Sequence, residues 1–498
     1  MSAPEVAPQN PPIPKQSELR RCISLAICVA LGAVLWFLPV PAGVDPRGWQ
    51  VMAVFVATIL SFILRPLPMG TMVLVGVIIL VLTNTFADPA TAPKKASKES
   101  LAYALSAFGN TTVWLVVAAF LISGVVIATG LGKRIALLLI SALGKTPLGL
   151  AYGIGAAELV LGPFVPSNTA RGGGILAPIV DSLCRTLVGD AERRRRNDVS
   201  AYLIQVGAHA NLITAAMFLT GMAANGLVSA AAQDVAGVEF GWGMWAKGAI
   251  VPGLAGLILL PVFLKFLLKP TGVDVAAARA KAGSDLKAMG PMSRNEWIML
   301  GVFVLMLGLW TTAKFHHIHT AVVALLGVVI CLVTGAQKWN DMAKNYGAWD
   351  AMVWLGGLIM MAGALKDFGV IDWFANNAKG WVTGFTPFYA AILLALIYFL
   401  SMYAFSMLTG HITAMVAAFI GVAIGVDAPA LLIIPLLAYF SNLCGSLTHY
   451  STGPVVIYFG LGYVEAPRWL RTGAFVGLFH IIVWLGIGLP WWKLLGWW

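Results

Sequence analysis

The stretch PFVPSNTARGGG, residues 163–174, interrupts an apolar region that runs from Pro147 to Val188. The apolar arms on either side of it are each shorter than the roughly 20 residues that a helix needs to cross a bilayer. Lys133 and Arg134 precede the region, and four consecutive arginines, residues 193–196, follow it. Cytoplasmic segments collect Lys and Arg, so both ends are expected on one side. The pattern predicts a re-entrant hairpin over about residues 147–188; a single kinked helix is the alternative.

The composition of the whole chain is that of a membrane protein. Hydrophobic residues make up 59% of the 498 positions, charged residues 11%, and the mean hydropathy is +0.86, whereas soluble proteins carry about 25% charged residues. The short alternating segments of a transmembrane β-barrel are absent. We therefore expect an all-α polytopic membrane protein. The net charge of +11 is attributed to orientation signals in the loops rather than to a nucleic-acid partner.

The apolar runs and the basic residues between them predict about eleven transmembrane helices plus two re-entrant hairpins, the second over about residues 386–426. The first run follows Arg20 and Arg21 and is interpreted as a membrane helix rather than a signal peptide. We divide the chain into a cytoplasmic tail (1–21), a first helix with the first repeat (22–268), a cytoplasmic linker (269–296) and a second repeat (297–498). The N-terminus is expected in the cytoplasm and the C-terminus in the periplasm of a bacterial inner membrane.

The two halves share short motifs in the same order. The tripeptide VWL at 113–115 recurs at 353–355, and the hairpin around Ser167 has a counterpart around residues 406–415. An odd number of predicted crossings separates the halves, so the two repeats should have opposite orientations. Carriers built from inverted-topology repeats bind their cargo at the repeat interface, near the middle of the membrane, on interrupted helices.

The first hairpin tip has the chemistry of an anion site. Helix N-termini present unpaired N–H groups and positive dipole ends, and Ser167, Asn168 and Thr169 add donors suited to carboxylate oxygens. Arg171 is costly in the membrane interior and can hold a carboxylate with two parallel hydrogen bonds. Two alternatives remain open. The polar side chains cap the broken helix, or Arg171 pairs with Glu158, which could also bind a proton.

A second tip and two further helix breaks complete the candidate site. The second tip offers His411, which can carry a proton near neutral pH, and a histidine satisfied between packed helices is the alternative. The substrate-binding candidates at this tip and at the two breaks are Thr409, Gly410, His411, Thr413, Thr220, Gly221, Asn225, Thr452, Gly453 and Pro454. We expect these residues and the first tip to surround one substrate anion.

The sequence patterns do not indicate a metal, a cofactor or a catalytic centre. The five cysteines are scattered without metal-ligand spacing, and HHIH at 316–319 lies in a short outer loop without a nearby acid or Cys. The stretch RGGG at 171–174 lacks the Lys-Ser/Thr ending of a phosphate loop. We therefore expect a transporter without cofactors rather than an enzyme.

Several motifs give the chain a specific resemblance: PSNTAR (166–171), TTVWL (111–115), GKRIA (132–136), IDWF (371–374) and YSTGP (450–454). The sequence resembles the divalent anion/sodium symporter superfamily, in the branch of bacterial citrate/succinate and tartrate/succinate antiporters and plastid 2-oxoglutarate/malate translocators. The resemblance covers nearly the whole chain. It implies a homodimer, an elevator-type carrier whose transport domain holds both hairpins, and Ser167, Asn168 and Thr169 as substrate ligands.

The second tip departs from the pattern of that family. Sodium-coupled members carry Ser-Asn-Thr at both tips, whereas this chain has Gly410-His411-Ile412 at the second. The change removes side-chain oxygens and adds a possible cation, and Arg171 places another positive charge beside the first tip. We therefore expect sodium-independent exchange of di- or tricarboxylates of the succinate, malate, 2-oxoglutarate, citrate or tartrate type. A Na⁺- or H⁺-coupled symporter of the same anions is the alternative.

Overall fold

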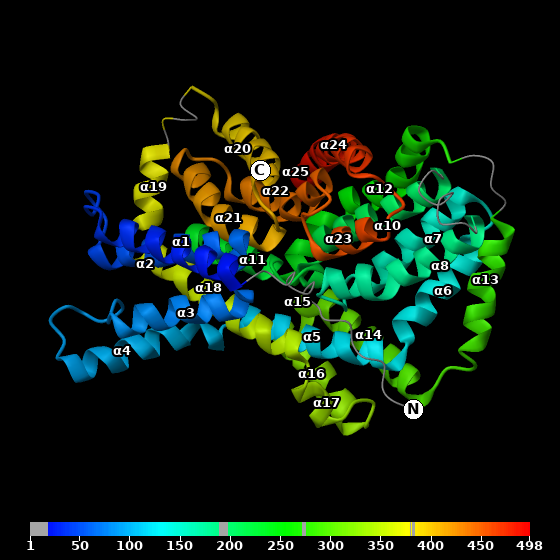
Figure 1. The fold of residues 1–498 in the computed structure, drawn as a ribbon, viewed down its shortest axis with the longest axis horizontal. Helices are drawn as coiled ribbons and strands as arrows, with labels where there is room; N and C mark the ends of the chain where they lie inside the picture. The colour runs from blue at the N-terminus through cyan, green and yellow to red at the C-terminus, as the bar shows by residue number, and fades with distance from the viewer. Residues whose placement is uncertain (1–17, 189–197, 271–274, 379, 381–383) are drawn as a thin grey trace.

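The computed structural model describes residues 18–188, 198–270, 275–378, 380 and 384–498 (Figure 1). Within these residues the regular structure is helical, without strands. Nine of the described helices are long and apolar enough to cross a membrane. The prediction of an all-α polytopic membrane protein is confirmed. Most of the predicted cytoplasmic tail and the arginines at 193–196 lie outside the described residues.

The described elements follow one another in two stretches of the chain. The first contains α1 (Glu18–Phe37), α2 (Pro46–Leu64), α3 (Met69–Leu82), α4 (Pro93–Ser106), η1 (Ala107–Gly109), α5 (Thr111–Thr129), α6 (Leu131–Leu143), α7 (Pro147–Leu161), η2 (Thr169–Leu176), α8 (Ala177–Val188), α10 (Asp198–Met217), η3 (Leu219–Gly221), α11 (Asn225–Ala236), α12 (Trp242–Leu268) and α13 (Ala276–Ala288). The second contains α14 (Arg294–Thr311), α15 (Ala313–His316), α16 (Thr320–Val333), α17 (Trp339–Ala343), α18 (Tyr346–Asp367), α19 (Val370–Ala378), α20 (Pro387–Ser401), η5 (Met402–Ala404), α21 (Leu408–Gly425), α22 (Ala430–Leu443), η6 (Cys444–Leu447), α23 (Gly453–Gly460), α24 (Ala466–Val483), η7 (Trp484–Gly488) and α25 (Leu489–Leu494).

Local sequence signals set the ends of several helices. Asn110 caps α5, because its Oδ1 accepts from the N–H of Thr112 at 2.8 Å, and Gly130 ends this helix with a φ of +79°. At the start of α14, the side chains of Ser293 and Glu296 each accept from the other residue's backbone N–H, which is a capping box. These signals separate α5 from α6 and fix where the second stretch of membrane helices begins.

Both interrupted regions fold as two arms joined by a non-helical tip. In the first, α7 ends at Leu161 and the chain becomes helical again at Thr169 as the π-helix η2, which continues into α8. In the second, α20 and η5 are followed by an open tip, and α21 begins at Leu408. Helix α10 packs against both α7 and α8, and α22 packs against both α20 and α21. Each hairpin is thus braced by a neighbouring interrupted helix.

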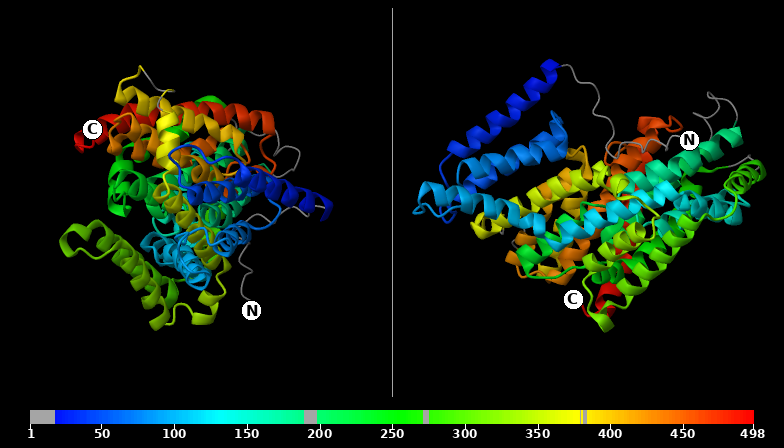
Figure 2. Two further views of the ribbon diagram at one scale, coloured as in Figure 1. Left: turned by 90° about the vertical axis from the view of Figure 1, so that its left-hand side faces the viewer. Right: turned by 90° about the horizontal axis from the view of Figure 1, so that it is seen from below.

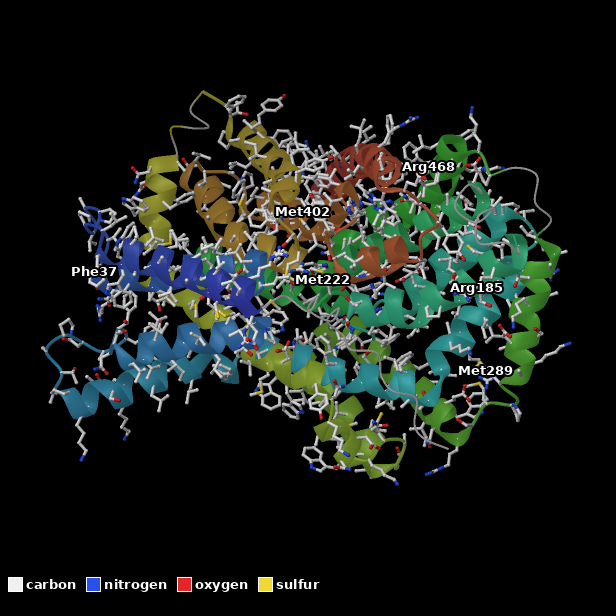
Figure 3. All side chains as sticks on the ribbon, viewed as in Figure 1. Phe37, Arg185, Met222, Met289, Met402 and Arg468 are labelled. Atoms are coloured by element: carbon white, nitrogen blue, oxygen red, sulfur yellow. The ribbon has the colours of Figure 1, made fainter. Side chains whose placement is uncertain are left out.

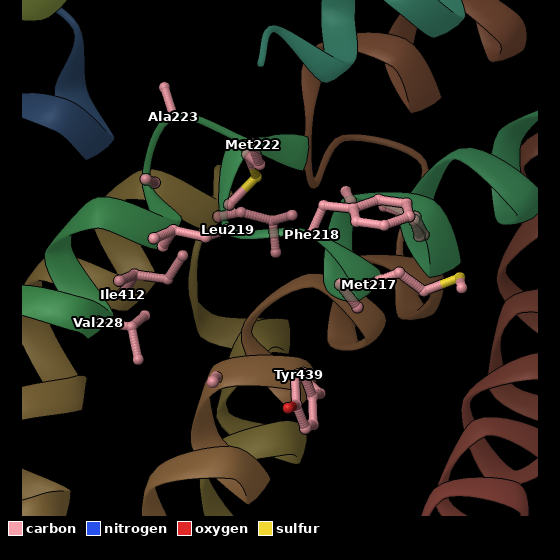
Figure 4. Packing of buried hydrophobic residues seen from close by; sticks show 14 of the residues in the cluster. Met217, Phe218, Leu219, Met222, Ala223, Val228, Ile412 and Tyr439 are labelled. Carbon is pink, nitrogen blue, oxygen red and sulfur yellow. The ribbon is translucent and has the colours of Figure 1, made fainter. Parts of the chain in front are cut away.

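The two bracing helices are themselves broken where the sequence turns polar. The chain leaves α10 at Met217, passes through η3 and starts α11 at Asn225; Figure 4 shows this open segment with Phe218, Leu219 and Met222 on it. Similarly, the chain leaves α22, passes through η6 and a non-helical stretch at 448–452, and starts α23. We call the stretches at 218–224 and 448–452 the first and second break.

The helices form two groups that contact one another (Figure 1). The wall group comprises α2, α3, α5, α14, α16 and α18, which pack on one another, and the hairpin group comprises α7, α8, α10, α11, α12 and α20–α24. Contacts between α11 and α18 and between α2 and α21 join the groups. Helix α1 packs on α2 and lies at the periphery in both views of Figure 2.

The predicted linker at 269–296 is more ordered than a simple connection. It contains α13, which packs against α6 and α8. A buried ion pair joins Nε of Arg134 on α6 to Oε1 of Glu296 on α14 at 2.6 Å, and Nη1 of Arg134 also donates to the carbonyl of Gly290 at 2.9 Å. The linker therefore ties α6, next to the first hairpin, to the wall group.

Candidate functional site

A cavity of about 110 Å³ lies where the two hairpin tips and the two breaks meet. The hairpin group contributes residues 166–169 of the first tip, 222–224 of the first break, 407–409 of the second tip, and 452–453 at the second break. The wall group contributes Met69, Phe120, Gly347, Asp350 and Trp354. Figure 3 labels Met222, on the first break, near the centre of the molecule. The cavity therefore lies between the two groups.

Four helices of the hairpin group begin at this cavity: η2 at Thr169, α11 at Asn225, α21 at Leu408 and α23 at Gly453. The first N–H groups of a helix have no acceptor within the helix, and the dipole adds about half a positive charge at this end. At α11, α21 and α23 the N-cap residue does not cap the first turn with its side chain. The cavity is thus surrounded by helix ends that favour an anion.

Polar contacts tie the first tip to both breaks. Nδ2 of Asn168 donates to Oγ1 of Thr452 at 3.2 Å, although the two residues are 284 positions apart. Oγ1 of Thr220, on the first break, donates to the carbonyl of Pro163 at 2.6 Å. Oγ of Ser167 accepts from the N–H of residue 170 at 3.1 Å, so this hydroxyl supports the first turn after the tip while it lines the cavity.

Arg171 pairs with Glu158, which was the alternative to substrate contact in the sequence analysis. Its side chain is fully buried and does not line the cavity. Nε donates to Oε2 of Glu158 at 2.6 Å, Nη1 donates to the carbonyls of Val165 at 2.7 Å and Gly221 at 3.0 Å, and Nη2 donates to Oγ1 of Thr214 at 3.2 Å. Arg171 therefore lies behind the first tip and fastens it to the first break, and Glu158 is its charge partner.

His411 is also packed between helices rather than exposed to the cavity. Its Nε2 lies 2.8 Å from Oγ of Ser401 and 3.0 Å from the carbonyl oxygen of Tyr398. The imidazole packs against the rings of Tyr398 and Phe405, with centroids 4.3 and 5.0 Å away. The second tip is instead joined to the second break, because the N–H of residue 408 donates to the carbonyl of Ser451 at 2.8 Å.

The remaining candidates divide between the cavity and the layer behind it. Six of the predicted residues line the cavity: Ser167, Asn168, Thr169, Thr409, Thr452 and Gly453. The layer behind it holds Thr220, Gly221, Asn225, Gly410, Thr413 and Pro454, together with Arg171 and His411. Of these, the side chains of Arg171, Thr220 and Asn225 hold the first tip or the first break through hydrogen bonds to backbone carbonyls.

Sequence reasoning missed the wall side of the cavity. Gly347, Asp350 and Trp354 lie on one face of α18, because their spacings of three and four residues bring side chains to the same side of a helix. Asp350 is not among the candidate residues that the sequence predicted for the site. An acidic residue at the edge of an apolar run was the signal that could have identified it.

Comparisons with known proteins agree with this architecture. The family model for the sodium:sulfate symporter transmembrane region matches residues 19–498. The chain is 42% identical over 484 residues to the putative malate transporter YflS of Bacillus subtilis, covering 97% of this chain and 98% of that protein. It is 38% identical to the chloroplastic dicarboxylate transporter 1 of Arabidopsis thaliana (95% and 83% covered) and 34% identical to the citrate/succinate antiporter of Escherichia coli K12 (94% and 96% covered).

The fold is also similar to a solved structure. The crystal structure of the Alcanivorax borkumensis YdaH transporter aligns with a TM-score of 0.53 at 14% identity, covering 86% of this chain and 98% of that one. The expectation of a transporter rather than an enzyme is confirmed by the family match. The chain belongs to the sodium:sulfate symporter family, the group of divalent anion/sodium symporters that its sequence resembles.

Proposed function

We propose that this chain is a secondary transporter that exchanges di- or tricarboxylate anions across a bacterial inner membrane. The observation that carries the proposal is the convergence of four helix N-termini on one cavity whose described lining includes no basic side chain. Four ends with about half a charge each supply about two positive charges, which match the two negative charges of a dicarboxylate. The hydroxyls of Ser167, Thr409 and Thr452 add hydrogen-bond donors for carboxylate oxygens.

The relatives support a carboxylate as the substrate class. They are named as a putative malate transporter, chloroplastic dicarboxylate transporters and a citrate/succinate antiporter. Helix ends and hydroxyls recognise the carboxylate group rather than the carbon skeleton. We therefore propose a range of substrates that includes succinate, malate, 2-oxoglutarate, citrate or tartrate.

We further propose that exchange does not require sodium. The guanidinium of Arg171 donates to the backbone carbonyls of Val165 and Gly221, which belong to the first tip and the first break. A bound Na⁺ would need oxygen ligands such as these two carbonyls. Here the guanidinium of Arg171 already contacts them. At the second tip, Gly410 offers no side-chain oxygen, and Nε2 of His411 contacts the carbonyl of Tyr398.

For the transport step we propose an elevator motion of the hairpin group against the wall group, in a homodimer. This proposal is supported by the position of the cavity between the two groups, since a relative movement of the groups would carry the tips and the bound anion together. We place the N-terminus in the cytoplasm and the C-terminus in the periplasm.

Counterflow in proteoliposomes tests the function. Vesicles loaded with unlabelled succinate should accumulate labelled succinate, malate or citrate when all sodium is replaced by choline. Empty vesicles should accumulate little label, and sulfate in place of the loaded carboxylate should not support counterflow. Uptake that requires sodium would favour the symporter alternative over the exchanger. Uptake into vesicles without internal substrate, driven by an imposed proton gradient, would do the same.

A further inference from the structure

The cavity has a negatively charged residue on its wall side, which is unexpected in an anion site. Asp350 is half-buried, and among the described residues that line the cavity it alone carries an ionisable side chain. Gly347 and Trp354 lie on the same face of α18. A carboxylate beside a bound dicarboxylate would repel it, so the position of Asp350 needs a physical reason.

The reason lies in the wall group itself, where two more helices begin at the cavity. Helix α3 starts at Met69 and α18 starts at Tyr346, next to the lining residue Gly347. Asp350 lies over the first turn of α3, since a Cβ added to Gly70 would overlap its Oδ1. Pro68, the N-cap of α3, provides no side-chain cap, whereas Asn345 caps the first turn of α18. The carboxylate therefore lies where the positive end of α3 would otherwise face the cavity.

The charges on the two sides can be compared. The hairpin group presents four helix ends, or about two positive charges, whereas the wall group presents two helix ends, or about one. One carboxylate cancels the charge of the wall but not that of the tips and breaks. With Asp350 ionised, an anion in the cavity is attracted by one side only.

Resting on the proposed function, we infer that Asp350 is a positioning residue that makes the substrate bind to the moving hairpin group and not to the wall. When the hairpin group moves away from α3 and α18, the substrate must leave the wall without resistance. An uncancelled positive wall would hold the anion between the two groups, so that tighter binding would be accompanied by slower transport. Asp350 thus lowers the affinity for the substrate and raises the rate of transport.

Neutral substitutions of Asp350 test this inference. Asp350→Asn removes the charge with little change in shape, and Asp350→Ser removes it while keeping a hydroxyl able to cap α3. We expect both variants to bind succinate roughly tenfold more tightly, which corresponds to about 1.4 kcal/mol. Their maximal exchange rate should fall by a similar factor, so KM and turnover decrease together. Asp350→Glu should stay close to the parent protein, because it keeps the charge.

The measurements are isothermal titration with succinate in detergent and counterflow in proteoliposomes. Asp341→Asn, at an exposed position on α17, makes the same charge change away from the cavity and should alter neither quantity. Unchanged or weaker succinate binding by both Asp350→Asn and Asp350→Ser overturns the inference, as does tighter binding with an unchanged exchange rate. Absence of exchange in the parent protein would count against the proposed function instead, and the titration would still decide whether Asp350 weakens anion binding.

Discussion

Asn225 and Asn442 join the two broken helices inside the hairpin group. Nδ2 of Asn442, on α22, donates to Oδ1 of Asn225, at the start of α11, at a distance of 2.9 Å, and both side chains are fully buried. Nδ2 of Asn225 in turn donates to the carbonyls of Ala215 and Phe218, the latter in the first break. The pair therefore links α22 to the open backbone that helps to form the cavity.

Substitution of Asn442 should loosen this link. Asn442→Ala leaves Oδ1 of Asn225 buried without its donor, which typically costs about 1–3 kcal/mol. We expect a lower midpoint of thermal unfolding in detergent and a reduced exchange rate, because the first break is less well held. Asn340→Ala, at an exposed position on α17, serves as the control and should leave both quantities unchanged. A variant as stable and active as the parent protein would show that the pair does not support the break.

Two threonines on α21 have hydroxyl groups with different roles: one lines the cavity, and the other bonds to the backbone of its own helix. Thr409 lines the cavity, whereas Oγ1 of Thr413, one turn later, donates to the carbonyl of Thr409 at 2.7 Å. Thr→Val conserves shape and removes the hydroxyl. We expect Thr409→Val to raise the KM for succinate about five- to tenfold, since a hydrogen bond contributes about 1–1.5 kcal/mol.

Thr413→Val is the matched control for that measurement and should leave the KM near the parent value. Exchange is measured in proteoliposomes over a range of external succinate concentrations. An equal rise in KM for both variants would mean that α21 shifts as a whole. A rise for Thr413→Val alone would mean that Thr413, and not Thr409, contacts the substrate.

The Arg171–Glu158 pair should behave as a structural unit. Removing one member of a buried ion pair leaves an unpaired charge and typically costs about 3–5 kcal/mol. We therefore expect Arg171→Met and Glu158→Gln to lower the unfolding midpoint strongly, and the double variant to be less destabilised than the sum of the two. Full thermal stability of Arg171→Lys together with a selectively raised KM would instead assign Arg171 to direct substrate contact.

The positions of the hairpin tips could be predicted from the sequence because their signals are local. Pro163 and Pro166, followed by three glycines, end one helix and begin another within about ten residues. The partner of Arg171 could be narrowed to two possibilities but not chosen, since Glu158 lies on the other arm and meets it only after the chain turns back at the tip. Without that geometry, the sequence pattern favoured a substrate carboxylate and kept Glu158 as the alternative partner.

The wall side of the cavity could not be predicted, because it depends on contacts between distant segments. Asp350 meets α3 through packing between elements about 280 residues apart in the chain, and the periodicity of α18 gives no sign of this. His411, in contrast, was identified from the sequence as a candidate, but its role was not. Its residue type allowed either a cation at the site or a packed histidine, and the contacts with Ser401, Tyr398 and Phe405 that support the packed histidine are visible only in the structure.

Gly453 provides a steric test of the contact between the first tip and the second break. A Cβ at this position would overlap Oγ1 of Thr169, so the absence of a side chain is what allows the N-terminus of α23 to approach the tip. We expect Gly453→Ala to abolish exchange while the protein still reaches the membrane and can be purified, because the tip must move away from the cavity. Gly460→Ala, on the same helix with open space around it, should be active. Thr169→Ala added to Gly453→Ala removes the overlapping atoms and should restore part of the counterflow. Exchange by Gly453→Ala at the parent rate would mean that the tip and α23 are further apart in the transporting states than they are here.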